Sequence, residues 1–296
     1  MGGFKRVSLK IKNLIITFYR FLVKNIIPKN RLGDNFISYL NFYFFHKRFP
    51  AKKMTFNDEL FRIKVSDEIK MAERVFTSDK EFVKLFIKAV VGDHYNVPTL
   101  AILRSKEQIE HFEFPENCVV KPTHASGLVK FIFDKEGINK AEFKKWMDLN
   151  HYNSSREANY RYLSPKLIVE PQIFGRTNVD DIKFFCVNGV VKLIQWDFDR
   201  RINHTRKLYD RNWNDLLVSV GYPISNKSKS KPLNLIQMID IAEKIANYFK
   251  FVRIDMYCDE NTSRFVIGEI THCHGSANEA FDSKDSEDKI AKILFG

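Results

Sequence analysis

Two short stretches near the C-terminus predict a β-hairpin: Phe251-Val252-Arg253-Ile254-Asp255-Met256-Tyr257 and Phe265-Val266-Ile267-Gly268-Glu269-Ile270-Thr271. Polar residues 259–263 predict the turn between them. Successive side chains in a strand alternate between faces, so Arg253 and Asp255 should share one face. Glu269 and Thr271 should share a face in the same way, and the opposite face should carry Ile254, Met256, Val266 and Ile270. Because Mg²⁺ commonly uses one or two carboxylates together with phosphate oxygens, the hairpin predicts a magnesium–phosphate site. The alternative interpretation is that the charged face of this hairpin is only solvated and binds nothing.

Further strands and loops are predicted upstream of this hairpin. Residues 118–122 form an apolar strand that carries Lys121, the small-residue loop His124-Ala125-Ser126-Gly127 follows, and residues 129–133 predict the return strand. Residues 166–173 predict a strand that contains Glu170. Residues 181–189 predict a strand that ends in an Asn-Gly hairpin turn.

The order of these elements resembles the ATP-grasp superfamily, and within it the teichuronopeptide-biosynthesis-like (TupA-like) family. That family shows an HGSG-like loop, a D-x-KFFCFNG strand, an R…N…YD.DW segment and a GE.T..HGSG ending. The matching stretches here are 124–127, 181–189, 201–213 and 268–276. Each motif is short, but their shared order and spacing carry the resemblance across residues 55–281.

The resemblance implies an α+β (α/β) ATP-grasp fold, in which two α+β lobes sandwich ATP. The implied segments are a basic apolar N-terminal arm at 1–54, a pre-ATP-grasp lobe at 55–115, a small lid lobe at 116–173 and a catalytic lobe at 174–296. Helices are expected within 79–89, 140–149 and 233–248, and a surface loop at 224–232.

The same resemblance implies roles for the motif residues, with ATP and Mg²⁺ as cofactors. Arg253 and Lys183 would stabilise the transferred phosphoryl group. Mg²⁺ would be bound by Asp255, Glu269 and Thr271, the last of which stands where the superfamily has Asn. The nucleotide would be bound by Lys121, His124, Ser126, Gly127, Glu170, Gln172, Ile173 and Lys183.

An acceptor site is predicted after the strand 190–196, because polar and cationic side chains gather there. The candidates are Arg201, Asn203, His204, Tyr209, His272 and His274. The planar guanidinium of Arg201 fits a carboxylate. A solvated loop is the alternative, and a metal on the two histidines is less favoured because no third ligand lies nearby in the sequence.

The resemblance implies an ATP-dependent carboxylate–amine ligase that works through an acyl phosphate. In its close family, the substrates would be an amino acid or peptide and a uronic-acid-type carboxylate of a cell-surface polysaccharide. Three alternatives remain: a glycan kinase, a binding module with an inactive ATP site, and a glycosyltransferase that uses Asp197-Phe198-Asp199 for a metal. A P-loop is excluded because no G-x-x-x-x-G-K-[ST] is present.

Positive charge is concentrated at the N-terminus. The chain has 296 residues and a net charge of +12, and residues 1–54 contain twelve Lys/Arg and one acidic residue. This segment is also rich in Phe and Leu, a pattern typical of an anionic membrane surface, although packing on the body is the alternative. The longest uncharged run within residues 9–24 is 13–19, which is too short to span a bilayer.

We therefore expect a cytoplasmic protein, peripheral on the inner face of the cytoplasmic membrane. Nucleic acid is not expected as a partner, because the remaining residues are nearly neutral. No small-residue cleavage site follows the apolar stretch, so no cleavable signal is expected. The four cysteines, at 118, 186, 258 and 273, lack zinc spacing and predict buried reduced thiols.

Overall fold

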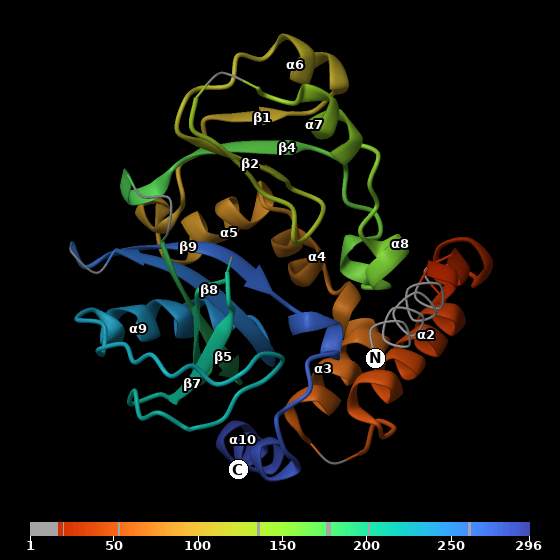
Figure 1. The fold of residues 1–296 in the computed structure, drawn as a ribbon, viewed down its shortest axis with the longest axis vertical. Coiled ribbons are helices and arrows are strands. Elements are labelled where there is room, and N and C mark those ends of the chain that lie inside the picture. The colour runs from red at the N-terminus through yellow and green to blue at the C-terminus, as the bar shows by residue number, and fades with distance from the viewer. Residues whose placement is uncertain are drawn as a thin grey trace, which may run out of the picture.

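The computed structural model describes residues 17–296 except 20, 53, 135–136, 176–178, 201 and 260–261. These described residues form two sheets whose strands pair antiparallel, as Figure 1 shows. The small sheet has the order β1-β4-β2-β3, and the large sheet has the order β7-β6-β5-β8-β9. Helices pack against both sheets, so the α+β fold class predicted from the sequence is confirmed.

The small sheet forms the upper lobe in Figure 1. Its strands are β1 (Ala101–Leu103), β2 (Cys118–Pro122), β3 (Lys130–Ile132) and β4 (Leu167–Pro171). One face is covered by α6 (Lys106–His111) and α7 (Lys140–Trp146), whose Ile109 and Phe143 pack on Val120 and Val169. Helices α6 and α7 begin where side chains cap them: Ser105 accepts from the Gln108 amide, and Asn139 accepts from the Glu142 amide. The small lobe therefore includes β1 and α6, which lie in the segment 55–115.

The large sheet contains both turns that the sequence predicts. Its strands are β5 (Asp180–Val187), β6 (Val190–Phe198), β7 (Thr205–Asp210), β8 (Phe251–Asp259) and β9 (Arg264–Thr271). Asn188 and Gly189 join β5 to β6 with φ of 49° and 79°, so the Asn-Gly turn is confirmed. The β8–β9 hairpin is confirmed as well.

A bulge in β9 corrects one predicted side-chain direction. Asp255 pairs with Glu269 but Met256 pairs with Ile267, so Gly268 is the extra residue. A Cβ at Gly268 would lie 2.4 Å from the Tyr257 ring, which explains why glycine occupies the bulge. The extra residue reverses the alternation, so Ile267 packs in the core beside Ile270. The prediction that Val266 shares a face with Ile270 was wrong.

Helices cover the two faces of the large sheet unequally. One face is covered by α5 (Phe82–Val90), η3 (Asp93–Tyr95) and α9 (Leu235–Ala246). On the other face, α2 (Arg31–His46), α3 (Phe56–Val65) and α10 (Lys284–Phe295) bury Phe185 and Val187 of β5. Two and four residues earlier, Lys183 and Asp181 lie on the same face but line a cavity. The helices therefore leave the polar half of this face open.

Helix α2 packs on the body of the protein. Its side chains Ile37 and Phe42 are fully buried, and Phe42 belongs to the core around α3 and α10. The segment 1–54, predicted as an arm, therefore contributes to this core; its residues 1–16 lie outside the described residues. No helix in the described ranges is long and apolar enough to cross a membrane.

Short elements connect these layers. They are η1 (Leu22–Ile26), η2 (Asp67–Lys70), α4 (Ala72–Ser78), α8 (Tyr152–Ser155), η4 (Ala158–Tyr160), η5 (Ile173–Gly175) and η6 (His274–Ala277). The connection through α8 and η4 runs from the small lobe past the N-terminal helices before it returns to β4 (Figure 1).

Candidate functional site

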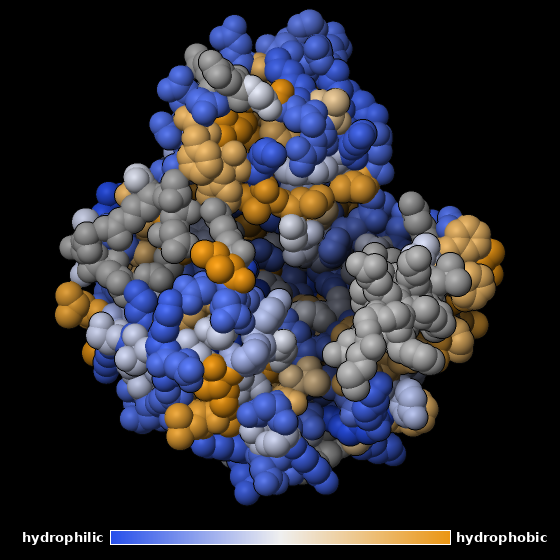
Figure 2. All heavy atoms as spheres, viewed as in Figure 1, coloured by the Kyte–Doolittle hydropathy of each residue, from blue (hydrophilic) through white to orange (hydrophobic). Residues whose placement is uncertain are grey.

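A cavity of ≈ 650 Å³ lies between the small sheet and the open half of the large sheet. Figure 2 shows it as a shadowed hollow beneath the upper lobe. Its walls come from β2, β4 and the loop after β2, from β5, β8 and β9, and from the segments around Lys80 and Tyr160. Most of the predicted nucleotide and metal residues therefore meet in one place, although they are spread over 150 positions of sequence.

The small-sheet wall holds a lysine–carboxylate cluster. Lys121 Nζ lies 2.7 Å from one Glu170 oxygen, and Lys84 Nζ lies 2.6 Å from the other. Although burial opposes it, these two lysines hold the pKa of Glu170 below its usual value. Burial alone would lower the pKa of Lys121, but the Glu170 carboxylate raises it. Both groups therefore remain charged inside the cavity.

The loop after β2 lies over the same wall. Ser126 and Gly127 are exposed and line the cavity, and Gly127 supplies the positive φ of 81° that the loop needs. Ala125, which stands where the family usually has glycine, is not among the positive-φ residues of the described chain. His124 is buried beneath the loop, where its ring contacts Trp146 O and the Lys166 amide. Gln172 and Ile173 line the far end of this wall.

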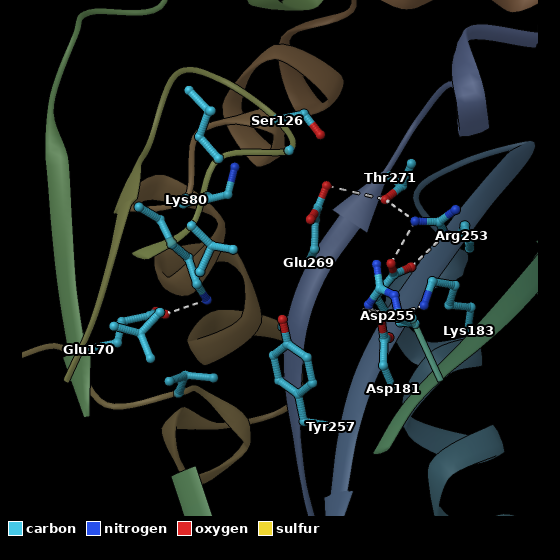
Figure 3. Close-up of a pocket in the computed structure, with 18 of the residues that line it drawn as sticks. Lys80, Ser126, Glu170, Asp181, Lys183, Arg253, Asp255, Tyr257, Glu269 and Thr271 are labelled. Atoms are coloured by element: carbon cyan, nitrogen blue, oxygen red, sulfur yellow. Dashed lines mark hydrogen bonds and ion pairs between the residues drawn. The ribbon is translucent and has the colours of Figure 1, made fainter. Parts of the chain in front are cut away.

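The β8–β9 hairpin forms the opposite wall. Arg253 donates two hydrogen bonds of 2.6 Å to Asp255, and its Nη2 lies 3.2 Å from the Thr271 hydroxyl (Figure 3). Glu269 is paired in register with Asp255 and points into the space toward Lys80. Its carboxylate accepts a hydrogen bond from the Thr271 hydroxyl at 3.4 Å.

This pair of carboxylates fits a Mg²⁺ ion. Asp255 and Glu269 lie opposite each other on neighbouring strands, and each carboxylate has more lone pairs than its present hydrogen bonds use. Within the described ranges, no group of three or more His, Cys, Asp or Glu could hold a metal alone. Mg²⁺ prefers to bind two protein carboxylates and to take its remaining ligands from phosphate and water.

Lys183 lies beside the hairpin in a second charged cluster. Its Nζ is 2.5 Å from Asp181 and 3.2 Å from Asp197, and it lines the cavity. Asp197 is also bound by Arg206 at 2.6 Å. Burial raises the pKa of Asp197, but the hydrogen bond with His204 and the charges of Lys183 and Arg206 hold it well below its usual value. Asp199 is instead exposed and pairs with Lys227. Asp197 and Asp199 therefore do not form a joint metal site, which removes the observation behind the glycosyltransferase alternative.

The structure does not bring the predicted acceptor residues together. Arg201 lies outside the described residues, and Asn203 is exposed away from the cavity lining. His204 stacks on Tyr222 with ring centroids 3.6 Å apart. Tyr209 is buried in the core, stacked on Trp213 at 4.3 Å. A tyrosine in this core cannot contact a sugar in the cavity.

The two C-terminal histidines support the cavity wall from behind. His272 touches the cavity edge, but its ring nitrogens contact Arg74 and the Thr77 hydroxyl. His274 lies between Arg253 and Glu279, with Nε2 2.9 Å from the Glu279 carboxylate. Both are buried, so they orient neighbours and present little surface to a ligand.

Several cavity residues were not predicted from the sequence. Asp181 and Tyr257 could have been found by strand alternation, because each lies two residues from a predicted site residue. Lys80 donates a 2.6 Å hydrogen bond to Ala125 O in the loop after β2, and burial lowers the pKa of this lysine. No local pattern marks Lys80, and the same holds for His151, Glu157, Tyr160 and Arg200.

Among solved structures, the chain is similar to three ligases at low identity. D-alanine–D-alanine ligase from Helicobacter pylori is 15% identical with a TM-score of 0.42, over 75% of this chain and 62% of that one. The enzyme of the same name from Bacillus anthracis is 16% identical with a TM-score of 0.39, over 74% and 65%. The ATP-grasp ligase PsnB, complexed with a phosphomimetic variant of its minimal precursor, Mg and ADP, is 11% identical with a TM-score of 0.41, over 77% and 60%. The chain spans less than two thirds of the length of each of these proteins.

The sequence itself decides the family. No curated protein matches the chain. The family model for TupA-like ATP-grasp proteins, however, matches residues 60–293, which is most of the chain and includes all the strands described above. The family predicted from the motifs is therefore confirmed: the chain belongs to the TupA-like ATP-grasp family.

Proposed function

We propose that the protein is a carboxylate–amine ligase that forms an amide between an amino acid or peptide and a uronic-acid-type carboxylate in cell-surface polysaccharide synthesis. The observation that carries this proposal is that the two facing walls of the cavity hold different charged groups. Lys121 and Lys80 face the cavity from one side, and Arg253, Asp255 and Glu269 face it from the other. Cations for phosphates and carboxylates for Mg²⁺ are the groups that phosphoryl transfer requires.

Each wall has a separate task in this proposal. Lys121 and Lys80 would bind the phosphates of ATP, and the exposed loop at Ser126 and Gly127 would cover them with backbone N–H groups. The far end, at Glu170, Gln172 and Ile173, would bind adenosine. When bound at Asp255 and Glu269, Mg²⁺ would neutralise charge on the transferred phosphoryl group.

Arg253 and Lys183 would stabilise the charge that develops as the substrate carboxylate becomes an acyl phosphate. Both are held by buried carboxylates, Arg253 by Asp255 and Lys183 by Asp181, so their positions are set before substrate binds. Preorganised charges of this kind cost no reorganisation at the moment of reaction.

A protein nucleophile is not needed for this chemistry. Cys273 is the cysteine that lines the cavity within the described ranges, and burial raises the pKa of its thiol. The thiol therefore stays protonated at neutral pH, which makes it a poor nucleophile. This supports direct attack of the amine on an activated carboxylate.

The test is product analysis with ATP, Mg²⁺ and uronic acids. Glucuronate, galacturonate and their uridine diphosphate forms would each be incubated with hydroxylamine, which traps acyl phosphates as hydroxamates. The proposal expects ADP and a hydroxamate. ADP with a phosphorylated sugar and no hydroxamate would identify a glycan kinase instead, and release of uridine diphosphate without ADP would identify a glycosyltransferase. Either result overturns the proposed ligase.

We also propose that the outer face of α2 brings the protein to the anionic inner face of the cytoplasmic membrane. Leu32 and Phe36 are 80% and 54% exposed and lie one helical turn apart, and Tyr39 and Tyr43 continue the same stripe. Apolar side chains gather along this edge of the molecule in Figure 2. Phe44, Phe45 and Phe49 are also exposed, beside Lys47 and Arg48. Exposed aromatics next to basic residues suit an interfacial position on anionic lipid.

A further inference from the structure

We infer that Glu157 binds the amine substrate as an ammonium ion and accepts its proton, with the Ser276 hydroxyl positioning the carboxylate. This inference rests on the proposed ligase function and identifies the part of the cavity that the second substrate occupies. Glu157 lies between α8 and η4, outside every motif that predicted the nucleotide site.

Glu157 differs from the other buried carboxylates of the cavity in having no cationic partner. Glu170, Asp181 and Asp255 each form an ion pair with a lysine or arginine. Among the described residues, no cation lies within ion-pair distance of Glu157 or Glu269, and Glu269 is reserved for Mg²⁺ in the proposal. Buried charges in proteins are normally paired or bind a cation, so Glu157 is suited to a cationic ligand.

The surroundings of Glu157 hold the carboxylate in place but do not neutralise its charge. It is 6% exposed, lines the cavity, and accepts a hydrogen bond from the Ser276 hydroxyl. Lys64, whose charge interacts with that of Glu157, instead donates to the backbone carbonyl of Ser276 at 3.4 Å. Burial raises the pKa of Glu157 although Lys64 opposes this, which makes the carboxylate a stronger base.

The backbone of η6 is strained to bring Ser276 to this position. Gly275, Ser276 and Ala277 all have positive φ, at 54°, 56° and 61°. For residues other than glycine, such conformations are strained and persist where the surroundings impose them. This segment is held by hydrogen bonds from Ser276 to Glu157 and from Lys64 to Ser276 O, and by the contact of the His46 ring with Ala277 O.

The position of Glu157 also suits attack on an acyl phosphate. Its charge interacts with that of Glu269, and Tyr160 beside it interacts with Glu269 and Arg253. This end of the cavity therefore adjoins the metal and phosphoryl residues.

Atoms and charge balance in the transfer of the amine to the acyl phosphate. The ammonium gives one proton to Glu157, and the nitrogen lone pair attacks the carbonyl carbon of the acyl phosphate. A C–N bond forms, and the C–O bond to phosphate breaks with its electron pair leaving on phosphate. The second proton lost by nitrogen goes to the departing phosphate, so the products are an amide, inorganic phosphate and protonated Glu157.

The test compares two nucleophiles in the full-length protein with ATP, Mg²⁺ and the uronic acids named above. Hydroxylamine is uncharged at neutral pH and needs neither an anionic site nor a base. Ammonium chloride and the common amino acids, each tested separately, need both an anionic site and a base. We expect Glu157→Gln to keep the wild-type rate of hydroxamate formation and to lower amide formation by about 10²-fold or more, the usual contribution of a general base. Glu116→Gln, at an exposed glutamate, is the matched control.

Ser276→Ala keeps the carboxylate and serves as the second variant if Glu157→Gln does not fold. It should raise the KM of the amine and leave hydroxamate formation unchanged, a split that a general loss of structure would not produce. Equal loss of both reactions, or unchanged amide formation, overturns the role of Glu157. If the wild type forms a hydroxamate but no amide from any amine, the ammonium site alone is overturned. If the wild type forms no hydroxamate, the proposed ligase is overturned as well.

Discussion

Arg156 donates a 3.0 Å hydrogen bond from Nη1 to Asp34 Oδ1, which joins α2 to the cavity wall across 122 positions of sequence. The Arg156 side chain is fully buried and also donates to the carbonyls of Pro28 and Ile27. The next residue is Glu157, which lines the cavity. The N-terminal helices are therefore part of the framework that positions this wall, although the sequence predicted a basic apolar arm at 1–54.

Replacing Asp34 with Asn should destabilise the protein. The change leaves the buried Arg156 cation without its anion, and breaking a buried ion pair costs about 3 kcal/mol. Urea unfolding of Asp34→Asn measures the loss, with Asp67→Asn as the control because Asp67 is 71% exposed. A difference below about 0.5 kcal/mol, the usual range for surface changes, would show that the pair does not hold this wall.

Replacing Lys121 with Ala should weaken ATP binding by about tenfold or more, because a charged hydrogen bond to phosphate contributes about 1.5–3 kcal/mol. Glu170 keeps Lys84 as a partner in this variant, so the fold should survive. Calorimetry with ATP and Mg²⁺ gives the affinity. Lys88→Ala is the matched control, since Lys88 is an exposed lysine that pairs with Asp93. Equal ATP affinity in the two variants would remove Lys121 from the phosphate site.

Replacing Glu269 with Gln should abolish ATP turnover while the fold survives, because the amide keeps the shape but loses the charge that Mg²⁺ needs. Asp255→Asn should have the same effect on turnover, with an added stability loss because Arg253 loses its partner. Activity is measured across a Mg²⁺ titration, and chelation of Mg²⁺ should abolish wild-type turnover. Full activity of both variants at low Mg²⁺ would contradict the metal assignment.

The stability of the protein should fall as the pH drops below about 6.5. Burial lowers the pKa of His274 from 6.5 to about 4. Between these values the unfolded chain binds a proton that the folded chain does not, so acid favours unfolding. From pH 6.5 to 5 this ring contributes about 2 kcal/mol to the loss.

Urea unfolding at both pH values checks this in His274→Gln, which should lose less stability on acidification than the wild type by about that amount. The control variant is His94→Gln, at an exposed histidine. If His274→Gln keeps the full wild-type pH dependence, the ring is not the group that titrates.

Binding to anionic liposomes should depend on the outer face of α2. Each apolar side chain that leaves water contributes about 1.5–3 kcal/mol, so Leu32→Ser with Phe36→Ser should lower partitioning by about tenfold or more. Flotation with anionic and with neutral liposomes measures this. Ile236→Ser on α9, at a site 79% exposed, is the control. Deleting residues 1–54 is unsuitable because it would also remove the buried Ile37 and Phe42. Equal flotation of the double variant and the wild type would contradict the membrane proposal.

The sequence by itself determined the elements that depend on near neighbours. The β8–β9 hairpin, the Asn188-Gly189 turn and the strand around Lys121 follow from side-chain alternation and turn chemistry, which act over a few residues. The ordered motifs along the chain were sufficient to identify the TupA-like ATP-grasp family.

Only the tertiary structure decided which other side chains reach the cavity. Lys80 and Glu157 enter it, and Tyr209 and His274 are buried behind it, because these positions depend on packing between segments far apart in the chain. The bulge at Gly268 could not be predicted from its own strand for the same reason, because the extra residue is defined by pairing with β8. Alternation predicts a face only while the register is regular, and the register is a property of two strands together.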